Sequence, residues 1–288
     1  MSSRRRTARA ASDRAAPRQD RVLVRRPFEG LAGETDWVAL REVVPAATAP
    51  LTVQGHEGRD VVLSTVLPMA WPALVRADCQ VLLGLQVGST SGDASRDLGT
   101  ALALALEAEP GSPVVPPAGA TGPRLQDLLA GNHLEVTVQP GFDYWVQGAS
   151  TDAGAEVATS LERANASVVP TAAVKGVTSA YWCRMKSRSH LRWVLPEEED
   201  ALLDALSKLA VAGGLALGEG TRYVGSFRAH GLLVPVWDLP HAMEAEALEG
   251  PVAALRSRLD EALAGRAPLS DAERRARSGL LSRQLTLR

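Results

Sequence analysis

Cysteine is nearly absent from this sequence, in which 288 residues include only Cys79 and Cys183. Two cysteines cannot build a disulfide framework, and neither belongs to a CxxC motif, which excludes disulfide-built folds and CxxC redox chemistry. Both stand in apolar, strand-like surroundings, where cysteine usually acts as a small hydrophobic residue. We therefore predict that the two cysteines serve as packing residues and not as disulfide or redox groups.

Long apolar segments are also missing. The charged N-terminus is not followed by the apolar core of a signal peptide. Stretches such as LGTALALALEAEP, residues 98–110, are too short to span a bilayer. We therefore predict a cytoplasmic protein without membrane contact.

The usual motifs of metal and cofactor sites do not occur either. The histidines never form an i, i+4 pair, and no cysteine adjoins one, so we expect no metal site. The glycines of GEGTRYVG, residues 218–225, match neither the dinucleotide fingerprint nor a phosphate-binding loop. No GxSxG motif of serine hydrolases is present. We expect no cofactor and no catalytic residue, which leaves enzymatic activity uncertain and favours a non-enzymatic protein.

Basic residues gather at the two ends of the chain. Residues 1–26 hold nine arginines and two aspartates (+7), and residues 266–288 carry +4, so the net charge of −2 leaves −13 in between. An acidic body argues against a nucleic-acid-binding surface on the folded part. The low hydrophobicity and high charge of residues 1–25 predict that they form a disordered basic tail. Its alternative role is weak, non-specific contact with nucleic-acid phosphates, including RNA or ribosome association together with the C-terminal basic end.

Apolar periodicity predicts the elements of the first half. These are a short helix around Trp37, strands at 49–55, 59–68, 79–87 and 133–139, a helix from Asp93, and a short helix at 123–130. The continuous apolar run at 79–87 indicates burial on both faces of its strand. The stretch 110–123, rich in proline and glycine, predicts an exposed connector.

The second half has the same kinds of predicted element. The pattern predicts helices at 151–166, 196–214 and 251–264, strands at 171–177, 179–185, 190–196 and 232–240, and a last helix that begins with a capping box of Ser270 and Glu273. Four acidic residues at 197–200 suit the first turn of their helix, where the helix dipole favours negative charge. Pro235 inside the strand at 232–240 predicts an edge position or a bulge.

These elements predict an α+β protein of two similar-looking halves with mixed or antiparallel sheet, packed helices and a C-terminal helical segment. The predicted parts are the tail (1–25), an N-terminal half (26–150), a C-terminal half (151–266), and a capping helix with its tail (267–288). A strand followed at once by a long amphipathic helix in each half suggests a degenerate duplication. The alternative is that such strand–helix pairs are simply common.

One group of residues suggests binding chemistry. The stretches AYWCRMKSRSHLRW (180–193) and GEGTRYVGSFRAH (218–230) combine arginines with aromatic residues and histidines. The candidate ligand-binding residues are Arg184, His190, Arg192, Arg222, Tyr223, Arg228 and His230. If their strands are neighbours, the arginines converge into a concave cationic surface that would attract a carboxylate, a phosphate or an acidic peptide.

Two other interpretations of these residues stay open. In the first, the arginines hold the acidic turn 197–200 or Asp143 in place inside the molecule. A hairpin would also bring Cys183 near His190, as in a thiolate–imidazolium pair, although a buried structural cysteine is far commoner than a reactive one.

The sequence resembles an uncharacterised actinobacterial family, a domain of unknown function. The likeness covers residues 26–288 and is carried by RPFEGLAGETDWVALREVVPAATA, VLPMAWPAL, GDASRDL, AYWCR, HLRWVLPEEEDALLDAL, GEGTRYVGSFRAHGLLVPVWDLP and SRQLTLR. Members of that family often begin with a small SEC-C zinc motif. This chain departs from the pattern, because its first 25 residues contain no cysteine, which puts zinc binding in doubt. The resemblance implies no catalytic residues.

The leading functional hypothesis is a cytoplasmic binding or adaptor protein that holds an anionic partner on the Arg/Tyr/His surface. The alternative is an enzyme that acts on a small anionic substrate, carboxylate or phosphate, in the same cleft. An enzyme should show a deep pocket with a titratable group of perturbed pKa, which an adaptor does not need.

Overall fold

The structure of this chain is a computed structural model that describes residues 23–131, 133–146 and 155–283. The helices are α1 (Glu34–Glu42), α2 (Ala94–Leu106), α3 (Leu125–Leu128), α4 (Ala155–Ala166), α5 (Glu199–Val211), α6 (Glu249–Ala264) and α7 (Asp271–Ser282), with short 3₁₀ helices η1 (Pro68–Ala70), η2 (Asp143–Trp145) and η3 (Ala245–Leu248). The strands are β1 (Ala47–Leu51), β2 (Val61–Ser64), β3 (Ala73–Val75), β4 (Val81–Gly84), β5 (Ser112–Val114), β6 (Thr137–Val138), β7 (Thr171–Ala173), β8 (Ala180–Arg184), β9 (Ser189–Trp193), β10 (Arg222–Ala229) and β11 (Leu232–Leu239). The predicted α+β class is confirmed.

The first sheet is mixed. Its strand order is β5-β3-β4-β2-β1-β6, with β2 and β4 parallel and the other pairs antiparallel. All four residues of β4 are buried, as the continuous apolar run predicts. Helix α2 begins where expected, because the carboxylate of Asp93 accepts hydrogen bonds from the backbone N–H groups of Ser95 and Arg96.

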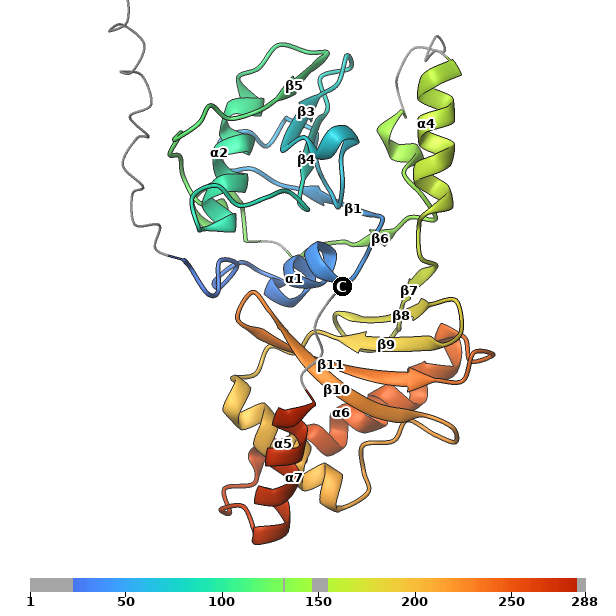
Figure 1. The fold of residues 1–288 in the computed structure, drawn as a ribbon. Helices are drawn as coiled ribbons and strands as arrows, with labels where there is room; N and C mark the ends of the chain where they lie inside the picture. The colour runs from blue at the N-terminus through green and yellow to red at the C-terminus, as the bar shows by residue number, and fades with distance from the viewer. Residues whose placement is uncertain (1–22, 132, 147–154, 284–288) are drawn as a thin grey trace, which may run out of the picture.

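The second sheet is antiparallel, in the order β10-β11-β9-β8-β7. In Figure 1 it lies below α1, with α5, α6 and α7 on the side away from the first sheet. Its helix-facing side carries Trp182, Leu191, Trp193 and Trp237, which share a core with those helices. Strand–helix succession occurs in both halves, at β4–α2 and β9–α5, whereas strand order and direction differ between the sheets.

The other face of the second sheet packs toward α1 and the first half. Tyr181, Val194, Phe227, Val234 and Val236 belong to the same buried cluster as residues of α1, α2 and the first sheet. This shared core covers one end of the sheet face. The predicted boundary at residue 150, like most of the tail 1–25, lies outside the described residues, so these divisions stay predictions.

Two local predictions in the second sheet are wrong. Residues 222–229, for which the sequence pattern predicts no strand, form the strand β10, because Tyr223, Phe227 and Ala229 supply buried positions on either side of a register shift between Tyr223 and Gly225. The edge position predicted from Pro235 is also wrong, since β11 lies between β10 and β9. Its ladder with β9 is interrupted at residues 234 and 235, where proline has no N–H to donate.

Candidate functional site

A buried carboxylate lies among basic side chains at one end of the second sheet. Asp238 of β11 is 9% exposed and stands opposite His190 of β9 and Arg222 of β10. Because directly opposed residues share a face of the sheet, His190 and Arg222 reach its carboxylate, and Arg188 reaches it from the turn before β9. Asp238 Oδ2 lies 2.9 Å from Nη2 of Arg222 and 3.0 Å from Nη1 of Arg188, and Asp238 Oδ1 lies 3.1 Å from Nδ1 of His190.

Arg192 extends this group along β9. It is two residues from His190 and therefore lies on the same face of the sheet, between Val236 of β11 and Tyr181 of β8. Arg192 is half-buried, and its guanidinium has no hydrogen-bond or ion-pair partner among the described residues. None of its nitrogens is among the buried unpaired atoms of the described residues, so the guanidinium is open to solvent or to a ligand.

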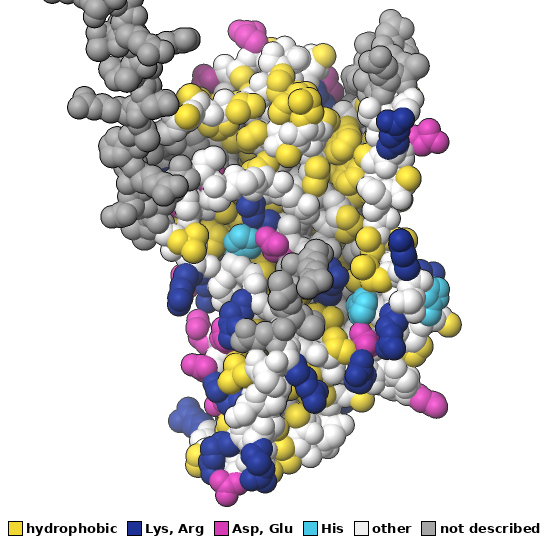
Figure 2. Space-filling model, in the orientation of Figure 1, with side chains coloured by type: hydrophobic (Ala, Val, Ile, Leu, Met, Phe, Trp, Pro, Cys, Tyr) yellow, Lys and Arg dark blue, Asp and Glu magenta, His cyan; other side chains and the backbone are white. Residues whose placement is uncertain are grey.

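We call Arg188, His190, Arg192, Arg222 and Asp238 the Asp238 cluster. Burial lowers the pKa of His190 against the attraction of Asp238, and the charges of Arg192 and Arg188 act in the same direction as burial. With the imidazole neutral, three guanidinium groups face one carboxylate. The cluster is therefore cationic within a chain whose net charge is −2. Figure 2 shows Lys and Arg side chains gathered over the lower half of the molecule, around the second sheet and its helices.

Two predicted site residues lie at the opposite end of β10. Arg228 Nε donates to Glu199 Oε1 at 2.9 Å and Oε2 at 2.7 Å. His230 Nε2 lies 2.8 Å from Glu42 Oε1, and its ring contacts Phe28 edge-on with centroids 5.4 Å apart. Six residues of extended strand, roughly 20 Å, separate Arg228 from Arg222. The predicted convergence of all the arginines therefore does not occur.

Two more predicted residues lie on the helix-facing side of the sheet. Arg184 stacks over the ring of Trp182, 4.8 Å from its centroid, and pairs with Glu244. Trp182 and Arg184 therefore share this face of the sheet. Tyr223 is buried against Trp237, with ring centroids 5.4 Å apart, and burial raises the pKa of its hydroxyl. Of the seven predicted residues, only His190, Arg192 and Arg222 belong to the Asp238 cluster.

The acidic turn before and within α5 is held by arginines from four different parts of the chain. The pairs are Glu197 with Arg256 (2.9 Å), Glu198 with Arg26 (3.1 Å), Glu199 with Arg228, and Asp200 with Arg277 (2.6 Å). Arg228 thus makes the contact that the intramolecular interpretation expects. Asp143, the other acid considered for that role, accepts from Asn165 instead.

Cys183 stands directly opposite His190 in the β8–β9 ladder, as the hairpin predicted. The thiol is buried, and burial raises its pKa although the charge of Arg192 opposes this shift. A protonated, buried thiol is a poor nucleophile. The pair therefore supports a structural cysteine.

Sequence reasoning did not select Arg188 and Asp238 as site residues. Arg188 lies in the stretch 180–193, and no pattern in the sequence sets it apart from the other basic residues there. Asp238 is the single charged residue in the apolar run LLVPVWDLP, residues 232–240. A lone carboxylate in a buried strand needs a partner, and this signal was available in the sequence.

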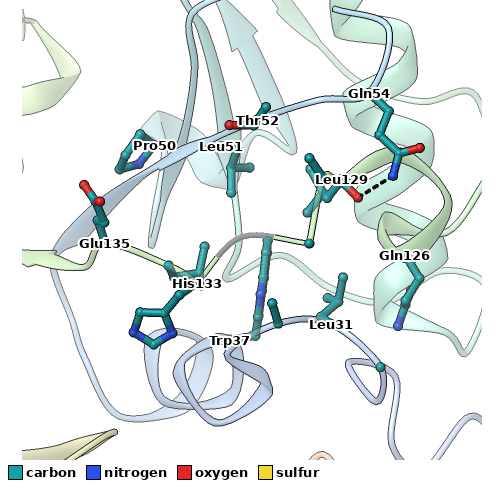
Figure 3. A pocket seen from close by; sticks show the side chains of 15 residues that line it. Leu31, Trp37, Pro50, Leu51, Thr52, Gln54, Gln126, Leu129, His133 and Glu135 are labelled. Carbon is teal, nitrogen blue, oxygen red and sulfur yellow. Dashed lines mark hydrogen bonds between the residues drawn. The ribbon is translucent and has the colours of Figure 1, made fainter. Parts of the chain in front are cut away.

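A separate pocket of about 400 Å³ lies in the first half, away from the Asp238 cluster. Its walls come from the loop before α1, from β1 and the residues after it, and from the segment that follows α3. Figure 3 shows Trp37 rising from α1 into its middle. None of the seven predicted site residues lines it.

A model of a family of unknown function, DUF5926, matches residues 27–288, so the chain belongs to that family. Neither the curated proteins nor the solved structures that were compared include a match. The resemblance to an uncharacterised family is thereby confirmed, whereas actinobacterial origin and the relation to the zinc motif stay expectations. Within the described residues, no group of three or more His, Cys, Asp or Glu side chains is placed to hold a metal ion. None of the described helices has the length and hydrophobicity needed to cross a membrane.

Proposed function

We propose that this member of the DUF5926 family is a binding protein whose Asp238 cluster holds an anionic group of its partner, a carboxylate or a phosphate. The observation that carries the proposal is Arg192, a half-buried residue whose guanidinium has no partner among the described residues. A bound anion would accept hydrogen bonds from the Arg192 guanidinium, because this planar group binds a carboxylate or phosphate in a bidentate manner.

The neighbouring groups support this role. Asp238 holds Arg188 and Arg222 by one oxygen and leaves their remaining N–H groups available. The side chains of these two arginines are 59% and 69% exposed, so an incoming partner can reach them. Arg192 would then serve as the buried end of the site, and the other two arginines as its exposed rim.

Binding is favoured over catalysis by what lies next to Arg192. Cys183 is buried, which raises the pKa of its thiol. Burial is also the largest cause of the lowered pKa of His190. Neither side chain offers an exposed nucleophile to a bound anion. The enzyme alternative on the same surface therefore has no specific observation in its favour.

Native mass spectrometry of the full chain, purified at low salt from cells of its own host, tests the proposal. The wild type and Arg228→Gln should retain an anionic molecule that Arg192→Gln loses, because Arg228 lies outside the cluster. Inorganic phosphate and citrate should also raise the melting temperature of the wild type more than that of Arg192→Gln. A bare mass for the wild type, together with equal thermal shifts for both proteins, would overturn the proposal.

A further inference from the structure

The pocket beside α1 contains an unusual tryptophan. Trp37 is 1% exposed and lines the pocket. The indole N–H groups of Trp145, Trp182, Trp193 and Trp237 each donate to a backbone carbonyl, at 2.8 to 2.9 Å. The N–H groups of Trp37 and Trp71 donate to no described residue, and of these two tryptophans Trp37 is the buried one. A buried indole N–H usually has an acceptor. Phe28 stacks on one face of the Trp37 ring, with centroids 5.9 Å apart, and a ligand in the pocket that Trp37 lines can supply the missing acceptor.

The walls around Trp37 are largely apolar. Leu31, Leu51, Leu129 and Leu134 line the pocket together with Pro50. Figure 3 places Leu51 and Leu129 on the side opposite to α1, so the space lies between aliphatic side chains and the indole. Such walls suit a flat aromatic ring. A volume of about 400 Å³ is within the range of small-molecule sites.

The charged groups around the pocket exclude an anion. No lysine or arginine lines it, whereas Glu135 does, and the pocket residue His133 has its Nε2 3.9 Å from Oδ2 of the buried Asp36. Glu135 and His133 stand on one side of Trp37, and Gln54 and Gln126 on the other (Figure 3). The amide nitrogens of both glutamines already donate to backbone carbonyls. The acidic side therefore prefers a ligand that donates hydrogen bonds.

We propose that this pocket binds a small planar heterocycle that bears an amino group. A ring nitrogen or oxygen would accept from the N–H of Trp37, the apolar walls would cover the ring, and the amino group would lie toward Glu135. The site differs from the Asp238 cluster in location and in the sign of its charge, and it does not depend on the function proposed there.

Indole-¹⁵N NMR of the full chain tests this assignment. The probes are adenine, 2-aminopyridine and 2-aminobenzimidazole, with benzoate as a planar anion of similar size. Loss of one cross-peak in Trp37→Phe assigns the Trp37 N–H. Amino heterocycles should shift that cross-peak selectively, and benzoate should not. Affinity should fall about fivefold in Trp37→Phe, which keeps an aromatic ring but loses the donor.

Two further variants make the test specific. Glu135→Gln, at an exposed position, should weaken the amino heterocycles and reduce the discrimination against benzoate. Trp71→Phe is the matched control, because Trp71 is a half-buried tryptophan outside the pocket lining and should leave affinity unchanged. The proposal is overturned if no probe shifts the Trp37 cross-peak, if benzoate binds as well as the amines, or if Trp37→Phe and Trp71→Phe bind equally.

Discussion

Ser179 Oγ donates a hydrogen bond of 2.5 Å to Asp36 Oδ1, although 143 residues separate the two in the chain. Ser179 directly precedes β8, and Asp36 lies in α1, so this bond joins the two halves inside the molecule. Asp36 is 4% exposed. Burial raises its pKa, against the opposing effects of the Ser179 hydrogen bond and the charge of His133.

The raised pKa of Asp36 predicts a pH-dependent stability difference. The folded protein holds a proton on Asp36 more tightly than the unfolded chain, so its contribution to stability grows as pH falls through the folded pKa. Asp36→Asn keeps an oxygen that accepts from Ser179 but removes the buried charge. Relative to the wild type, its free energy of unfolding should be highest at pH 7 and should decline as pH falls toward the ordinary aspartate range. Urea denaturation at several pH values measures this.

Asp97→Asn provides a control of opposite sign. Burial raises the pKa of Asp97, but hydrogen bonds from Ser89, Ser91 and Thr90 outweigh burial and lower it overall. Its stabilising contribution is present above the unfolded pKa and is lost as pH falls. Asp97→Asn should therefore be less stable than the wild type at pH 7 and approach it in acid. Parallel curves for the two variants would contradict the assignment for Asp36.

Two helical glycines should respond oppositely to alanine. A Cβ at Gly99 of α2 would lie 2.3 Å from the carbonyl oxygen of Pro123 and 2.8 Å from the carbonyl carbon of Arg124. Gly99→Ala should cost about 2 kcal/mol, because the backbone before α3 must move. A Cβ at Gly279 of α7 meets nothing within 4 Å. Gly279→Ala should stabilise by up to about 1 kcal/mol through helix propensity. Thermal or urea unfolding distinguishes them, and equal effects would refute the close approach at Gly99.

The contact between Arg228 and Glu199 should contribute to stability rather than to binding. The hydrogen bond from Arg228 lowers the pKa of Glu199, so the contribution is present at neutral pH and lost as pH falls through the folded pKa. Arg228→Glu should lower the free energy of unfolding by about 1 kcal/mol at low salt, and less at high salt. The double exchange Arg228→Glu with Glu199→Arg should restore most of it. Anion binding at the Asp238 cluster should be unaffected, and loss of binding would contradict the separation of the two places.

Much of the fold could be predicted from local patterns. Helices α2, α5 and α7 begin near their expected residues because their signals are local. These signals are the Asp93 cap, the acidic first turn, and the capping box of Ser270 and Glu273. The strand β10 was missed because charged residues and Gly225 interrupt its apolar alternation. Residues 222–229 form a strand because β11 pairs with them along their whole length, which local patterns do not reveal.

The sequence by itself determined the class of the fold, the uneven charge, and the cationic residue types from which the Asp238 cluster is built. Only the tertiary structure decided which of them meet. The strand order places Asp238 between His190 and Arg222. Arg228 lies at the other end of β10, where it pairs with Glu199. The N–H of Trp37, which donates to no described residue, likewise lies in a pocket built from segments distant in the chain. Local patterns determine helices and strands through interactions of near neighbours, but a site depends on long-range register, which no single segment contains.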